Sequence, residues 1–322
     1  MDLYLIIVII MLALAVSGLV VGVANDAVNF LNSALGSKAA PRYVIMTVAS
    51  VGIIVGAITS NGMMEVARSG VFHPEMFTFA EVMLLFLAVM FTNVILLDIF
   101  NTLGMPTSTT VSLVFGLLGA AVGISIFKIA NDALVTLPDG SLATMADMIN
   151  TGNAMAIIGG ILISVVIAFV CGTVVMYITR LIFSFRYQSK LKSYGAVWCG
   201  IALTAISYFA VFKGLKGTQV IPADWMSWME GHIPMMLGGL LVGWSLIMSI
   251  LSMLKVNILR ITVLAGTFSL ALAFAGNDLV NFIGVFVAGV DAYDIVRTTG
   301  DTNMLMGGLN DPVVANLLIL FL

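Results

Sequence analysis

Two short segments of the chain place Asp and Asn side chains inside strongly apolar stretches. They are the heptapeptides 25–31 and 277–283, and five of their seven positions are identical. A carboxylate with two amides in such surroundings is costly unless something compensates it, and its oxygens suit a small hard cation such as Na⁺. Helix capping explains one copy easily but two copies poorly. The predicted cation ligands are Asn25, Asp26, Asn29, Asn277, Asp278 and Asn281.

A third segment, 104–110, combines a proline with four hydroxyl side chains. Proline is favoured in the first turn of a helix, so we expect a helix to begin at Pro106. Hydroxyl groups beside the N–H groups of a helix N-terminus form an anion site. An ordinary Ser/Thr-capped helix start fits these residues equally well. The candidate anion ligands are Thr107, Ser108, Thr109 and Thr110.

The composition predicts that these segments lie in a membrane. Of the 322 residues, 61% are hydrophobic and 9% are charged, and the mean hydropathy is +1.15. A soluble domain cannot bury so much apolar surface, which excludes a cytosolic enzyme and a nucleic-acid partner. We expect apolar runs at 3–24, 43–60, 82–100, 107–127, 154–179, 194–212, 233–254, 258–275, 279–290 and from 313 onward.

Other residue types give no sign of enzymatic or metal chemistry. The sequence has no nucleotide-binding or nucleophile motif, which argues against an enzyme. His73 and His232 have no second ligand at metal-binding spacing, so no metal other than Na⁺ is predicted. Cys171 and Cys199 are interpreted as small core residues.

The charges between the apolar runs predict the orientation of the chain. If 107–127 counts as a crossing, the basic loops 37–43, 180–193 and 255–260 share one side and the acidic loops share the other. The positive-inside rule makes the basic loops cytoplasmic, with the N-terminus outside a plasma (inner) membrane. The two Asn-Asp copies then enter the bilayer from opposite sides. The predicted fold class is an all-α integral membrane protein, an inverted-repeat secondary transporter with broken or re-entrant helices.

No Lys or Arg is expected deep in a span, so a bound anion would depend on hydroxyls, N–H groups and bound cations. Without the cations, the site carboxylates would repel the anion, and this couples the two ligands. Asp98, eight residues before Pro106, is a further candidate as a proton carrier or anion acceptor. A carboxylate at the membrane surface is the alternative interpretation of Asp98.

At these motifs the chain resembles the inorganic phosphate transporter (PiT) family. That family carries two inverted Gly-Ala-Asn-Asp-Val-Ala-Asn motifs, each followed by a Pro-Val-Ser-Thr-Thr-His motif, and segments 23–29, 275–281 and 106–110 are similar to them. The resemblance implies a homodimeric symporter that imports inorganic phosphate with Na⁺ or H⁺. It implies sodium ligation by the six Asn and Asp residues named above. It also implies phosphate contacts from Ser108, Thr109 and Thr110, with Thr107 adjacent.

The chain departs from the family pattern at three places. Val23 replaces the first motif glycine, and Val111 replaces the motif histidine, which removes a titrating group and favours Na⁺ over H⁺. The third departure is that the second hydroxyl motif is missing. Ser108 follows Asp26 by 82 residues, and a second hydroxyl motif at the same distance from Asp278 would fall past the end of the chain. We therefore expect a truncated chain, with a first inverted repeat at 1–153, middle helices at 154–257 and the start of a second repeat at 258–322.

Three alternatives to Na⁺-coupled phosphate symport stay open at this point. A permease of the same fold could carry sulfate, or carry phosphate with H⁺. A channel would need a continuous polar lining, which the spans do not offer between the motifs. A truncated paralogue without transport activity also fits the expected end of the chain.

Overall fold

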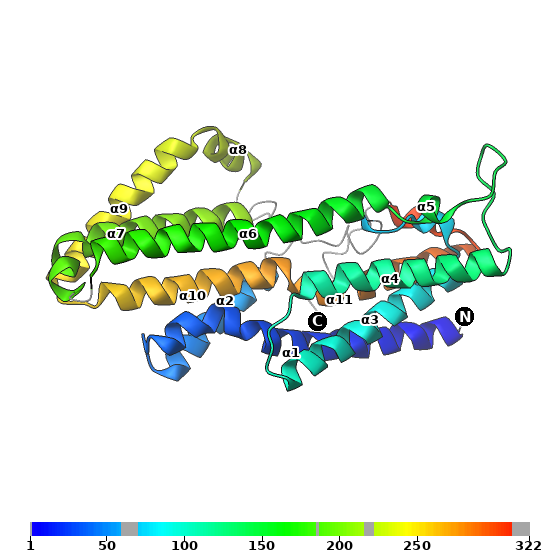
Figure 1. The fold of residues 1–322 in the computed structure, drawn as a ribbon, viewed down its shortest axis with the longest axis horizontal. Coiled ribbons are helices and arrows are strands. Elements are labelled where there is room, and N and C mark those ends of the chain that lie inside the picture. The colour runs from blue at the N-terminus through cyan, green and yellow to red at the C-terminus, as the bar shows by residue number, and fades with distance from the viewer. Residues whose placement is uncertain (1, 59–69, 185–186, 216–221, 311–322) are drawn as a thin grey trace. The chain divides into compact units, whose positions relative to one another are not determined.

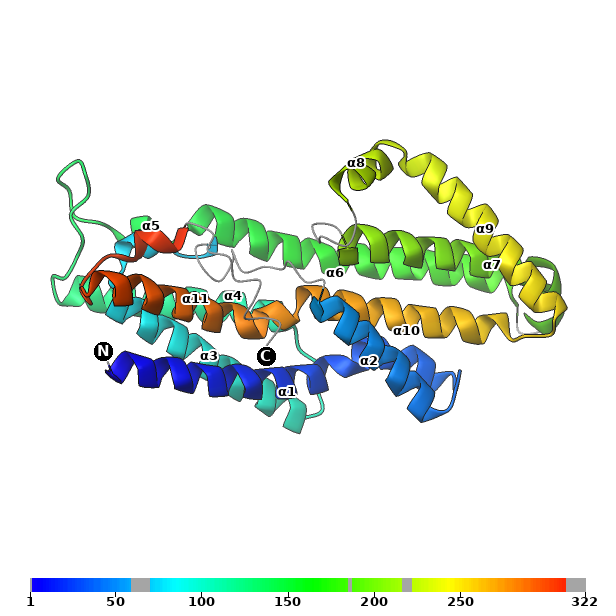
Figure 2. The same ribbon diagram turned by 180° about the vertical axis from the view of Figure 1, so that it is seen from behind.

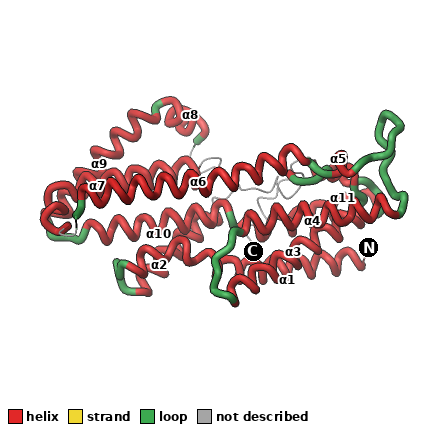
Figure 3. The backbone as a smooth tube through the Cα atoms, viewed as in Figure 1, coloured by secondary structure: helices red, strands yellow, loops and turns green. Residues whose placement is uncertain are grey.

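The computed structural model describes residues 2–58, 70–184, 187–215 and 222–310. Within these ranges the chain is mainly helical and contains no strand, and Figure 3 shows red helices joined by green loops. The long helices are α1 (Asp2–Gly36), α2 (Arg42–Ile58), α3 (Phe79–Thr102), α4 (Thr109–Ala130), α6 (Thr151–Ile182), α7 (Tyr187–Phe209), α9 (Ile233–Met253), α10 (Ile258–Asn277) and α11 (Leu279–Thr299). The short ones are η2 (Pro74–Met76), α5 (Met145–Met148), η3 (Ala210–Leu215), α8 (Ala223–Gly231) and η4 (Met306–Asn310).

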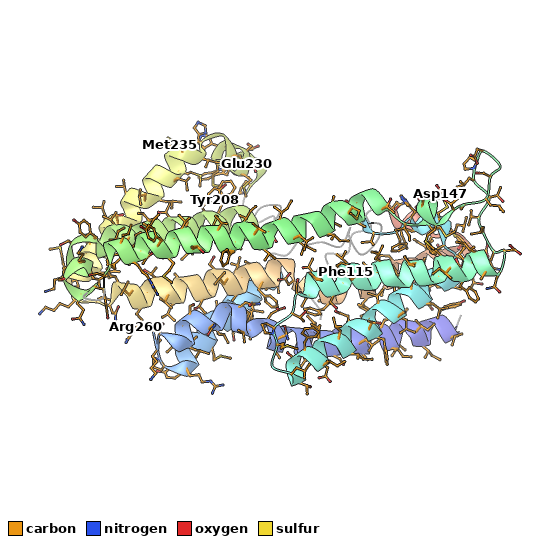
Figure 4. The ribbon with its side chains drawn as sticks, in the orientation of Figure 1. Phe115, Asp147, Tyr208, Glu230, Met235 and Arg260 are labelled. Atoms are coloured by element: carbon orange, nitrogen blue, oxygen red, sulfur yellow. The ribbon has the colours of Figure 1, made fainter. Side chains whose placement is uncertain are left out.

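The helices have the length and composition that a membrane requires. In the described part of the chain, seven helical segments are long and apolar enough to span a bilayer, and one of them combines α10 and α11. Large apolar side chains face outward, including the half-exposed Phe115 on α4 (Figure 4) and Phe169 on α6, which is 75% exposed. Such surfaces are stable in lipid and not in water. The predicted all-α integral membrane class is therefore confirmed. The apolar run expected from 313 lies outside the described residues.

Several predicted boundaries were wrong because helices continue past the apolar runs. The helix α1 continues through the first Asn-Asp copy to Gly36 without a break. Likewise α11 extends to Thr299, well past the end of the apolar run expected at 279–290. Helical geometry persists beyond apolar residues because its backbone hydrogen bonds do not depend on the side chains.

The chain folds into two compact units, each assembled from separate stretches. The first unit comprises residues 1–26, 62–162 and 277–322, and the second comprises residues 27–61 and 163–276. The first unit holds both motif aspartates and the whole hydroxyl segment, so it is the unit that carries the candidate site. The predicted division of the sequence into repeats at 1–153, 154–257 and 258–322 concerns internal duplication and not compact units in space. It stays a prediction.

The first unit packs α1, α3, α4 and α11 around one apolar core, and α3, α4 and α11 lie side by side in Figures 1 and 2. Close contact between α1 and α11 depends on a small residue. The ring of Phe282 lies against Gly22 so closely that a Cβ at this position would overlap it. At Gly18, one turn earlier, a Cβ would make only ordinary contacts with Phe282 and Val94. The second motif copy is thus anchored to α1 directly before the first copy begins.

A buried ion pair stabilises the far end of the first unit. The Nζ of Lys128, in the last turn of α4, lies 2.8 Å from Oε2 of Glu81 and 3.0 Å from the carbonyl oxygen of Met76. Glu81 also accepts a hydrogen bond from the backbone N–H of Thr78 in a capping box at the start of α3. Lys128 lies just past the apolar run expected at 107–127, so the expectation that no Lys or Arg lies deep in a span stays a prediction. Lys128 is 1% exposed because a carboxylate and a carbonyl satisfy its charge.

The second unit is also built on glycine contacts. Gly52 and Gly56 of α2 lie against the backbone of α10, and a Cβ at either position would overlap Leu272 or its neighbours. Gly200 of α7 makes an equivalent contact with Ser245 of α9. Close approach through small residues is the usual way for helices to pack in lipid. Cys199 is buried as predicted, whereas Cys171 is exposed on α6, so the core interpretation was wrong for that residue.

Candidate cation and anion site

The hydroxyl segment lies at the corner between α3 and α4. Gly104 adopts a positive φ of 69°, which ends α3 in a left-handed turn that favours glycine. The backbone N–H groups of Gly104 and Met105 donate to the carbonyls of Asn101 and Phe100 at 3.0 and 2.9 Å, which satisfies the last turn of α3. This turn brings the chain directly into the proline and hydroxyl residues that follow.

The helix α4 begins later than the proline predicted. Ser108 is the N-cap, and its hydroxyl accepts a hydrogen bond from the N–H of Val111 at 3.3 Å. Pro106 lies before this cap and not in the first turn, so its predicted position was wrong. The Ser side chain supplies an acceptor for an otherwise unpaired N–H group, which proline cannot do. The ordinary capping interpretation is therefore confirmed for Ser108, and its role toward an anion stays a prediction.

Asn25 of the first motif copy holds this corner against α1. Its Oδ1 accepts the N–H of Thr107 at 2.8 Å, and its Nδ2 donates to the carbonyl oxygen of Met105 at 3.1 Å. The same Nδ2 donates to Oδ1 of Asn101 at 2.8 Å, while Nδ2 of Asn101 donates to the carbonyl oxygen of Val21. A single buried amide thus fixes the backbone on both sides of Pro106. We call this set of bonds the Asn25 clamp.

Asn101 is the member of the clamp that sequence reasoning did not assign a role. It lies 76 residues from Asn25 in sequence, and neither a motif nor a spacing connects them. Its short distance from Pro106 was the one available signal, and that signal does not indicate a partner on α1.

The second motif copy meets the hydroxyl segment directly. The helix is interrupted at Asp278, which separates α10 from α11. Oγ1 of Thr110 donates to Oδ1 of Asp278 at 3.3 Å, and Nδ2 of Asn281 donates to the same two side chains, at 3.0 Å to Thr110 and 3.3 Å to Asp278. The expected break is therefore present in the second copy, and it places a carboxylate, an amide and a hydroxyl in one cluster.

Of the two motif carboxylates in this unit, that of Asp26 is buried and that of Asp278 is half-buried. Asp26 is 4% exposed, and its carboxylate repels that of Asp278 electrostatically. Thr110 and Asn281 donate hydrogen bonds to Asp278, whereas the carboxylate of Glu81 at the other end of the unit is paired with Lys128. Two like charges in a medium of low polarity repel strongly, so a cation between them would be stabilising.

The structure does not bring every predicted residue into this cluster. Asn29, one turn beyond Asn25, is exposed and belongs to the second unit. Asp98 is exposed on α3. The side chain of Asn277 lies outside the described residues. Thr109 is buried at 2% exposure in the first turn of α4, Thr107 is half-buried and Ser108 is exposed.

The fold and the site together define a class of protein. A bundle of apolar, membrane-length helices with a buried carboxylate, buried amides and a buried hydroxyl is typical of membrane transporters. A family model described as "Phosphate transporter family" matches residues 22–310, which include all three motifs. The chain therefore belongs to the phosphate transporter family, and the predicted resemblance is confirmed.

Two individual proteins are similar to this chain. A candidate phosphate permease of Thermococcus kodakarensis, TK2061, is 25% identical over 200 residues, which is 61% of this chain and 45% of that protein. The chain thus matches less than half the length of this curated relative. A solved structure described as "The sodium-dependent phosphate transporter" shares the fold, with a TM-score of 0.59, 17% identity and coverage of 94% of this chain and 73% of that one.

Proposed function

We propose that this protein imports inorganic phosphate by symport with Na⁺. The observation that carries the proposal is the bond between Thr110 and Asp278, because it joins the hydroxyl segment to the second Asn-Asp copy. A site for an anion and a site for a cation are then adjacent. Each ligand lowers the electrostatic cost of binding the other, which is the physical basis of coupled transport.

The cation is bound by oxygens of Asp26, Asp278 and Asn281. The two carboxylates supply the negative charge, and amide and backbone oxygens complete the shell of a hard ion. Asn29 and Asn277 belong to the predicted ligand set, while Asn25 contributes by holding the corner between α3 and α4. The name of the solved structure, a sodium-dependent transporter, supports Na⁺ as the coupling ion.

The phosphate is bound by the hydroxyl segment, from Thr107 to Thr110, with the N-terminus of α4 beside it. Hydroxyl and N–H donors hold the anion without a basic residue, so the bound Na⁺ supplies the positive charge. Monohydrogen phosphate also donates a hydrogen bond, which a carboxylate such as Asp278 accepts. Sulfate has no such donor, and the site should therefore reject it.

Transport follows an alternating-access cycle in which one helix bundle moves against another. We propose that the protein acts as a homodimer in the plasma membrane. The basic loops 37–43, 180–193 and 255–260 face the cytoplasm, and the N-terminus faces outside. The distribution of Lys and Arg supports this orientation.

The test is uptake of labelled phosphate by the full-length protein in proteoliposomes. A Na⁺ gradient should drive saturable uptake that a tenfold excess of sulfate leaves unchanged. Uptake driven by a pH gradient alone would show that H⁺ is the coupling ion, and Asp98 would then be the candidate proton carrier. Full competition by sulfate would contradict the assigned substrate, and uptake that does not saturate would indicate a channel.

A further inference from the structure

The amide of Asn281 is satisfied on one side and not on the other. Its Nδ2 donates to Thr110 and Asp278, whereas its Oδ1 is buried and has no hydrogen-bond partner among the described residues. Asn281 is 2% exposed, so bulk water does not compensate the oxygen. A buried carbonyl without a partner is unfavourable, and most such groups in proteins are satisfied.

A small cavity adjoins this amide inside the first unit. Its volume is about 10 Å³, and among its lining residues Asn281 and Asn93 are the polar ones. Asn93 lies in the middle of α3 and is 6% exposed. Its Oδ1 accepts the hydroxyl of Ser112 at 2.5 Å, which fixes the orientation of the Asn93 amide. A carbonyl oxygen has two lone pairs, so this oxygen can accept a second donor.

The cavity is too small and too apolar for a cation of its own. A dehydrated Na⁺ requires several oxygen ligands, and most of the lining side chains are aliphatic or aromatic. Its volume is, however, close to that of one water-sized group. The space next to Asn281 is therefore large enough for a rearrangement of that side chain.

We propose that the Asn281 amide is a cation-dependent switch and that Asn93 is its positioning residue. In the arrangement described here, the NH₂ group of Asn281 faces Asp278 and takes the place of a cation. When Na⁺ binds at Asp278, the amide turns over, so that Oδ1 coordinates the ion and Nδ2 enters the cavity to donate to Asn93. This inference rests on the proposed Na⁺ site and adds a residue that no motif contains.

The chemistry favours this rearrangement in one direction. An N–H donor and a cation compete for the same carboxylate oxygen, and the cation also repels the positive end of the N–H dipole. Rotation about the last side-chain torsion of Asn is broad and roughly two-fold, so the amide can turn without moving the backbone. After rotation, both ends of the amide have partners, and the uncompensated oxygen no longer exists.

An isosteric pair of substitutions tests the switch. Asn93→Val and Asn93→Thr leave side chains of the same shape, but only Thr retains an oxygen that can accept Nδ2 of Asn281. The measurement is equilibrium binding of radiolabelled Na⁺ to the purified full-length protein. We expect Asn93→Val to weaken Na⁺ binding about tenfold and Asn93→Thr by no more than about threefold, as for the loss of one buried hydrogen bond. The KM for phosphate at saturating Na⁺ should change less than about twofold in both.

Controls separate the switch from a general effect on folding. Ser125→Ala removes another buried hydroxyl from α4, one that does not line the cavity, and Na⁺ affinity should be unchanged. If Asn93→Val does not fold, Ser112→Ala carries the test, because loss of its bond to Asn93 should weaken Na⁺ binding about threefold.

The outcomes distinguish the switch from the proposed function. A wild-type protein that binds no Na⁺ would contradict both. If the wild type binds Na⁺ and both the Val and Thr variants bind it with wild-type affinity, the switch alone would be overturned. That result would indicate that the cavity holds only a water molecule. Equal weakening in both would also overturn it, because the oxygen would then have no role.

Discussion

The two copies of the Asn-Asp motif contain the same residue types but are used differently. In the first copy, α1 is continuous. Both ends of the Asn25 side-chain amide form hydrogen bonds at the corner before α4, with the backbone and with Asn101. In the second copy the helix is interrupted at Asp278, and Asn281 bonds to a carboxylate and a hydroxyl. The two asparagines therefore make different contacts, because the helix backbone is continuous around Asn25 and interrupted before Asn281.

One residue offers a physical reason for the difference. Ala24 precedes the first copy, and Gly276 occupies the equivalent place in the second. Glycine in a helix is less favourable than alanine by about 1 kcal/mol. The second helix is therefore less stable at Gly276, two residues before the interruption at Asp278.

The largest expected effect comes from neutralising the aspartate at the break. Asp278→Asn removes a negative charge from the proposed cation site and should lower Na⁺-driven phosphate uptake about 100-fold or more. Asp26→Asn should have a similar effect, because the proposed cation site includes both carboxylates. The measurement is the initial uptake rate in proteoliposomes, with Asp224→Asn on α8 as the charge-matched control. Sodium-dependent uptake at the wild-type rate in both variants would contradict the site.

The next effect concerns the contact that holds the second copy against α1. Gly22→Ala places a methyl group into the ring of Phe282 and should destabilise the protein by about 1–3 kcal/mol. Gly18→Ala is the matched control, since its methyl group would make ordinary contacts with Phe282 and Val94. Thermal unfolding in detergent measures both. Equal melting temperatures would show that α11 moves away from α1 without cost.

The smallest effect comes from exchanging the residues before the two copies. Gly276→Ala makes the second copy resemble the first and favours a continuous helix by about 1 kcal/mol. Na⁺ affinity should fall about fivefold, because that free energy opposes the break. The reverse change, Ala24→Gly, should lower the melting temperature and leave Na⁺ affinity unchanged. If both changes alter Na⁺ affinity alike, the helix break does not distinguish the copies.

The sequence predicted the membrane helices for a clear physical reason, and the same reasoning selected the candidate site residues. Long apolar runs have one stable form in lipid, and an aspartate among them is rare enough to indicate function. The bond between Thr110 and Asp278 joins two motifs that had been identified separately, so their proximity agrees with the predicted joint site.

What the sequence could not predict depends on contacts between distant segments. Asn101 acquires its partners only when α3 packs against α1, and Lys128 becomes buried only because Glu81 lies across from it. The continuity of α1 through Asn25 and Asp26 also depends on tertiary context, because polar residues in an apolar run fit a break and a helix equally well.

The most direct measurement compares Asn25→Ala with Asn281→Ala in the full-length protein. Equilibrium binding of labelled Na⁺, and of labelled phosphate at saturating Na⁺, is determined for each variant. Asn281→Ala should weaken Na⁺ binding about tenfold, whereas Asn25→Ala should keep Na⁺ affinity within about twofold and weaken phosphate binding about tenfold, because the hydroxyl segment loses its clamp. The same pattern of loss in both variants would contradict the division of roles between the two copies.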